Sequence, residues 1–96
     1  MSDRPIIDMD SAPRLAAHMR LKFDTTRASY TIQAPERVFL LDDVAHAIVT
    51  RCDGRARLAD IVGELCRLYG DAPAEEVGAD VLGVVQDFVD KGVMAL

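Results

Sequence analysis

The sequence predicts an α+β domain in which a three-stranded antiparallel sheet precedes a three-helix bundle, a winged-helix-like arrangement. Short runs typical of strands lie between residues 19 and 41, and helical spacing of apolar residues fills the rest of the chain. The 96 residues, half of them hydrophobic, suffice for one core. We therefore expect one domain over residues 18–96, after a flexible arm over residues 1–17 that Pro13 closes.

The first two strands are expected at residues 19–23 and 28–33. In the first, Met19, Leu21 and Phe23 alternate with charged residues, which is typical of a half-buried strand. The second is rich in β-branched and aromatic residues, which favour strands. The polar segment between them predicts the turn of a hairpin.

The third strand, expected at residues 37–41, is apolar on both faces. Val38 and Leu40 point one way, and Phe39 and Leu41 point the other. Such a strand is expected to be either central in the sheet or covered on both sides. At an edge, its free N–H and C=O groups would form a docking site for another strand.

Two amphipathic helices follow. Asp42 or Asp43 is expected to cap the first, whose apolar face extends to Cys52 and which ends at Gly54. Apolar spacing predicts the second over residues 58–69, with Gly70 as its stop.

Asp71 can cap a third helix, Pro73 suits its first turn, and Gly92 closes it. Residues 74–91 hold five acidic side chains and one basic one, so this helix is a poor candidate for nucleic-acid recognition. Its Gly78 and Gly83 allow close approach, either of a guest backbone or of a neighbouring helix. Its apolar stripe consists of Val77, Val81, Leu82, Val85, Phe88 and Val89.

Charge is uneven along the chain. Residues 1–57 hold nine basic and eight acidic side chains, whereas residues 58–96 hold two basic and eight acidic ones. The acidic second half is either a solvated surface or a surface that steers a basic partner.

Residues that could carry catalysis or bind metal are sparse. Cys52 and Cys66 are expected to be buried thiols, without a disulfide, and with His18 and His46 they do not make a metal-binding pattern. The paired carboxylates lie at expected helix starts, where acidic side chains are favoured. No export signal or membrane span is evident. We expect a cytoplasmic protein that is not an enzyme and that holds neither cofactor nor metal.

Several short segments, in their joint order and spacing, resemble the PqqD family. They are PERVFLL at residues 35–41, AIV at 47–49 and CDG at 52–54, followed by Ile61-Val62, Leu65, Tyr69 and Asp80-Val81. The resemblance extends from about residue 14 to the end of the chain. The second strand, SYTIQ, departs from the more aromatic family pattern, which leaves its limits open.

The resemblance implies a cofactor-free peptide chaperone of pyrroloquinoline quinone (PQQ) biosynthesis. It would bind the ribosomal precursor peptide PqqA as an added strand and present it to PqqE, a radical S-adenosylmethionine (SAM) enzyme. The recognition elements of other peptide-modification pathways share this fold. Carried over by position, the peptide-binding residues are Arg37, Val38, Phe39, Leu40 and Leu41 on the strand, with Val81, Leu82, Val85 and Phe88 walling a groove.

Two alternatives remain open at this stage. The chain could serve another peptide-modification pathway, or it could be a homodimerising winged-helix module with a structural or regulatory role. A bare edge strand suits either role, so we expect a monomer or a weak dimer formed by edge pairing or strand exchange.

Overall fold

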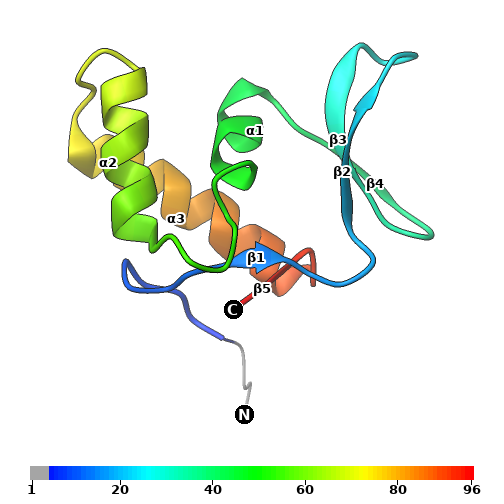
Figure 1. Cartoon of the computed structure of the whole chain (residues 1–96), viewed down its shortest axis with the longest axis horizontal. Coiled ribbons are helices and arrows are strands. Elements are labelled where there is room, and N and C mark those ends of the chain that lie inside the picture. The colour runs from blue at the N-terminus through cyan, green and yellow to red at the C-terminus, as the bar shows by residue number, and fades with distance from the viewer. Residues whose placement is uncertain (1–4) are drawn as a thin grey trace.

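The computed structural model describes residues 5–96, and its three helices gather on one side of a three-stranded sheet (Figure 1). The α+β prediction is confirmed: an antiparallel sheet precedes three helices. No helix in this range is long and apolar enough to cross a membrane. The elements are β1 Arg14–Leu15, β2 Arg20–Asp24, β3 Ser29–Gln33, β4 Val38–Leu40, α1 Asp43–Val49, α2 Leu58–Leu68, α3 Ala74–Asp90 and β5 Met94–Ala95.

The three-stranded sheet has the order β2-β3-β4, with β4 at one edge. Leu21 pairs with Ile32, and Ile32 pairs with Phe39, which places these three side chains on one face. Ile32 is fully buried, and Leu21 and Phe39 pack against the core. The sheet face that carries these three side chains is therefore turned toward the helices.

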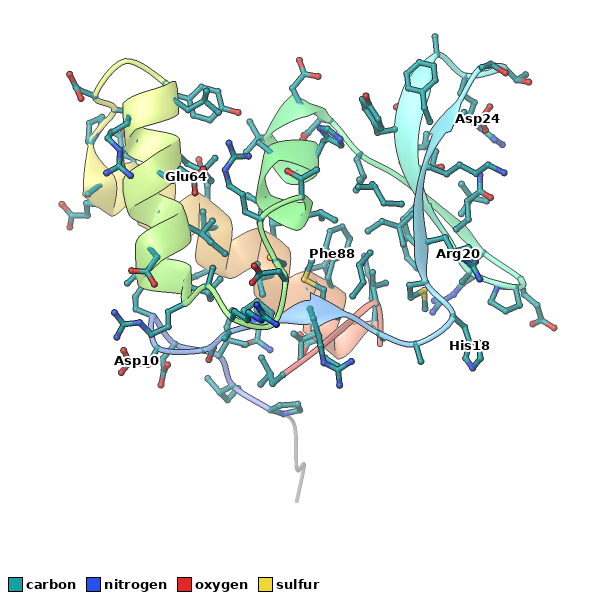
Figure 2. The ribbon with its side chains drawn as sticks, in the orientation of Figure 1. Asp10, His18, Arg20, Asp24, Glu64 and Phe88 are labelled. Atoms are coloured by element: carbon teal, nitrogen blue, oxygen red, sulfur yellow. The ribbon has the colours of Figure 1, made fainter. Side chains whose placement is uncertain are left out.

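Most of the core lies among the three helices, and this face of the sheet adds Ile32 to it. Apolar residues at helical spacing in α2 and α3 pack together, as the sequence predicts. Phe88, at the centre of Figure 2, joins the two layers. The most deeply buried apolar side chains of the helices and the sheet are Ile32, Ile48, Leu58, Ile61, Leu65, Val81 and Val85.

The helix ends differ in part from the sequence prediction. Asp42 caps α1, because its carboxylate accepts the N–H of Ala45 at 2.7 Å. The predicted extension of α1 to Cys52 is wrong: the helix ends at Val49, and the thiol folds back to the carbonyl of Ile48 at 3.2 Å. The predicted Asp71 cap is also wrong, because α3 begins after Pro73 without a side-chain cap.

The segment before the sheet is part of the fold. Residues 1–4 lie outside the described part of the chain, but residues 5–17, expected in a flexible arm, pack against the helices. β1 pairs with β5, and Ile7 is 7% exposed. The arm also replaces a helix cap: the carbonyls of Met9 and Ser11 accept the first N–H groups of α2, from Ala59 and Leu58.

Candidate functional site

The outer edge of β4 carries unpaired backbone groups. On the inner side, Ala34 donates to the carbonyl of Arg37 at 2.9 Å, and Leu41 donates to that of Tyr30 at 3.0 Å. Bonded pairs alternate along an antiparallel ladder, so the N–H and C=O groups of Val38 and Leu40 point outward. Within residues 5–96, no strand pairs with this side, which we call the open edge.

The side chains of β4 divide into a bare face and a packed face. Val38 and Leu40 are 47% and 62% exposed, whereas Leu41 is buried and Phe39 packs against the core. The strand that reads as apolar on both faces is therefore an edge strand with one face uncovered. The open edge combines free backbone groups with exposed apolar side chains, which is the combination that binds an extended peptide.

Two contacts place β4 beside the C-terminal half of α3. The rings of Phe39 and Phe88 meet edge to face, with centroids 6.3 Å apart. Arg37 lies with its guanidinium 5.0 Å from the centre of the Phe39 ring and donates to the carbonyl of Lys91 at 3.2 Å. Together, the Phe39–Phe88 contact and the Arg37–Lys91 hydrogen bond hold β4 in place beside α3.

The groove wall inferred from the resemblance is mostly core. Val81, Val85 and Phe88 are 1%, 0% and 7% exposed, and Leu82 is partly buried. This stripe packs into the core because a helix buries its apolar face.

The open surface of α3 belongs to a different stripe. A depression begins at Asp42, two residues after β4 ends, and its wall on α3 consists of Ala79, Asp80, Gly83 and Val84. Sequence reasoning missed this stripe because it followed the apolar spacing, although the stripe also repeats every three or four positions. We call it the α1–α3 depression; it is lined by Asp42, Val44, Ala45, Ala79, Asp80, Gly83 and Val84.

The two glycines of α3 play different parts. A Cβ at Gly78 would lie 3.2 Å from the Met9 methyl group, so this glycine packs against the arm. A Cβ at Gly83 would meet nothing within 4 Å, and the position is exposed. Gly83 therefore leaves room in the α1–α3 depression.

A second hollow continues from this depression between all three helices. Its volume is about 220 Å³, and it shares Val44 and Asp80 with the depression. Its walls are mainly apolar, with Glu76 and Asp80 as its carboxylates. We call it the helix cavity; it is lined by Val44, Leu65, Tyr69, Ala72, Glu76, Val77, Asp80 and Val81.

The two cysteines and two histidines considered in the sequence analysis do not form one site. Burial, with a smaller contribution from the charge of Asp53, raises the pKa of the Cys52 thiol to about 12, so this sulfur stays protonated and unreactive. Cys66 is free and partly buried. His46 lies on α1, whereas His18 lies near the opposite end of the sheet (Figure 2). In the described range, no three His, Cys, Asp or Glu residues form a metal-binding group.

Comparison with known proteins agrees with this fold. A family model described as coenzyme PQQ synthesis protein D (PqqD) matches residues 30–94. A protein of Rhodopseudomonas palustris strain HaA2 named PqqA binding protein is 42% identical over 95 residues, which cover 98% of this chain and 92% of that protein.

Two solved structures are also similar. The solution structure of the PqqD part of Methylobacterium extorquens PqqCD, described as a functional and stand-alone recognition element for ribosomally synthesised, modified peptides, has a TM-score of 0.74 and 37% identity, with 88% of each chain covered. The crystal structure of PqqD from Xanthomonas campestris has a TM-score of 0.60 and 38% identity, covering 94% of this chain and 99% of that one.

The fold and the open edge define a small α+β domain with one strand exposed at the edge of its sheet. The sequence match then makes the assignment specific. The chain belongs to the PqqD family.

Proposed function

We propose that this chain binds the precursor peptide PqqA by adding it to the open edge of β4, and that it holds the peptide for modification by PqqE. The observation that carries the proposal is the pair of outward N–H and C=O groups on Val38 and Leu40. The name of the R. palustris relative, PqqA binding protein, supports this choice of guest.

Strand addition suits a guest without a core of its own. A disordered peptide loses conformational entropy when it binds, and hydrogen bonds to a sheet edge offset that loss whatever its sequence. Alternate side chains of the added strand then point to opposite faces. One set can lie against the exposed apolar side chains of Val38 and Leu40, and the other set can face α3.

The α1–α3 depression extends this binding surface beyond the strand. Ala79 and Gly83 present little side chain, so a guest continuing past Leu40 can approach the helix closely. In this proposal, the exposed stripe of α3 replaces Val81, Val85 and Phe88 as the guest-facing wall.

We assign the chain a binding role in the cytoplasm, where ribosomal peptides are made, rather than a catalytic one. The chemistry would reside in the radical SAM enzyme PqqE, to which the guest is presented. A peptide held along one edge leaves its other edge and its flanking residues accessible to that enzyme.

Proline at Leu40 tests the open edge directly. Leu40→Pro removes an outward N–H that no strand of the described chain uses, and proline is tolerated at such an edge position. Leu40→Ala removes the side chain but keeps the N–H. We expect synthetic PqqA to bind Leu40→Pro at least about tenfold more weakly than Leu40→Ala, as measured by calorimetry.

The structure of each variant is checked by backbone amide NMR, which should show an intact sheet. Equal affinity of the two folded variants for PqqA would rule out strand addition at this edge. Phe39→Pro is unsuitable because the N–H of Phe39 points inward to β3, so the substitution would break the sheet itself.

The open edge also supports a second candidate, a homodimer in which two copies pair through β4. The same unpaired groups and exposed apolar side chains would serve a second copy of the chain. Sedimentation at rising protein concentration separates the candidates. Dimerisation that Leu40→Pro abolishes, without any PqqA binding by the native chain, would favour the homodimer.

A further inference from the structure

The helix cavity is a recess between α1, α2 and α3 that the strand-addition model leaves unused. Its volume of about 220 Å³ is below the roughly 300–1,000 Å³ typical of small-molecule sites, so a single large side chain suits it better than a cofactor does. Val44 is 40% exposed and Tyr69 is 44% exposed, so apolar surface remains accessible around the cavity.

The cavity is continuous with the path of the guest. Val44 and Asp80 line both the α1–α3 depression and the helix cavity, and the depression begins two residues after β4. A peptide that continues past Leu40 along the depression therefore comes to the rim of the cavity at Val44 and Asp80. The occupant is thus the part of the same peptide that flanks its strand-forming segment.

The charge around the cavity selects the chemistry of that segment. Glu76 and Asp80 lie one turn apart on α3, and both are exposed. Neither forms an ion pair with a basic side chain in the described part of the chain. Like charges at this spacing repel each other, and a guest cation between them would relieve that repulsion.

Resting on the proposed function, we infer that the guest peptide carries an apolar side chain next to a lysine or arginine, outside its strand-forming segment. The apolar side chain fills the helix cavity, and the basic one lies between Glu76 and Asp80. Specificity would then reside in this anchor, because hydrogen bonds to the open edge are independent of sequence.

A matched pair of glutamate variants tests the anchor. Glu76→Gln changes a residue that lines the cavity, and Glu75→Gln makes the same change at the adjacent exposed position, which does not line it. At low ionic strength we expect Glu76→Gln to weaken binding of synthetic PqqA about three- to fivefold, and Glu75→Gln less than about twofold. Equal effects of the two substitutions would overturn the inference.

Methyl NMR during the same titration distinguishes failure of the anchor from failure of the proposed function. Methyl shifts at Val77 and Val81, together with amide shifts at Val38 and Leu40, are the expected result. Amide shifts at the strand without methyl shifts in the cavity would overturn the anchor alone and leave strand addition in place. No shift in either set at saturating peptide would overturn both.

Discussion

The phenol ring of Tyr30 stacks on the imidazole ring of His46, with centroids 3.8 Å apart and planes at 20°. Phe23 meets the same phenol ring edge to face at 5.0 Å. Tyr30 belongs to β3 and His46 to α1, so the stack joins the hairpin to the first helix. Since β4 leads directly into α1, this contact helps to set the position of the open edge.

The first prediction concerns this stack. In a double-mutant cycle of Tyr30→Ala and His46→Ala, we expect a coupling energy of about 0.5–1.5 kcal/mol in the free energy of unfolding, measured with urea, because an aromatic pair adds stability beyond its buried area. The cycle of Phe23→Ala with His46→Ala is the control. A coupling no larger for Tyr30 than for Phe23 would contradict the prediction.

The second prediction concerns the arm. Ile7 is 7% exposed and packs in the core, whereas its neighbour Ile6 is 69% exposed. We expect Ile7→Ala to lower the free energy of unfolding by about 2–4 kcal/mol and Ile6→Ala by less than about 0.5 kcal/mol. Denaturant unfolding measures both. Equal small losses would mean that the arm adds little to the stability of the fold.

The third prediction concerns alkaline pH. The buried Cys52 thiol has a pKa raised from 9.0 to about 12, so the folded chain keeps a proton that the unfolded chain loses. The free energy of unfolding should therefore fall as pH rises above about 9, and this contribution should be fully present below that pH.

Comparison with variants isolates this contribution from other groups that titrate at high pH. Under reducing conditions, Cys52→Ala should show a shallower loss of stability between about pH 9 and pH 11 than the native chain does. Identical slopes for the variant and the native chain would refute the buried-thiol contribution.

The fourth prediction concerns the acidic half of the chain, which holds eight acidic and two basic side chains over residues 58–96. If this surface steers a basic partner, association should slow several-fold when ionic strength rises from about 0.01 M to about 0.15 M, with a smaller change in dissociation. Stopped-flow measurements with PqqA and with PqqE provide the test. Rates independent of salt for both partners would leave the acidic surface a solubilising role only.

Much of the local structure could be predicted because it depends on neighbouring residues. Period-two alternation around Leu21 and helical spacing from Leu58 onward place the strands and helices to within a few residues. Asp42 is recognisable as a cap because its partner, the N–H of Ala45, is only three positions away. These features follow from distances along the chain.

The binding surface could be predicted only in part. A strand that is apolar on both faces leaves its position in the sheet undecided. Among the strands of residues 5–96, β4 pairs with β3 alone, which makes it an edge strand. The apolar stripe of α3 marks the face that is buried in the core. The face of α3 that is open to a guest therefore lies outside this stripe, and the spacing of apolar residues does not reveal it.

The place of the arm could not be predicted at all from local patterns. Arg14 pairs with Ala95, and the N–H of Ile7 donates to the side chain of Gln86, 79 positions away in sequence. Periodicity and capping are set by residues a few positions apart, and they carry no information about such partners. These contacts form because folding brings together chain ends whose backbone groups and apolar side chains would otherwise be unsatisfied or exposed to water.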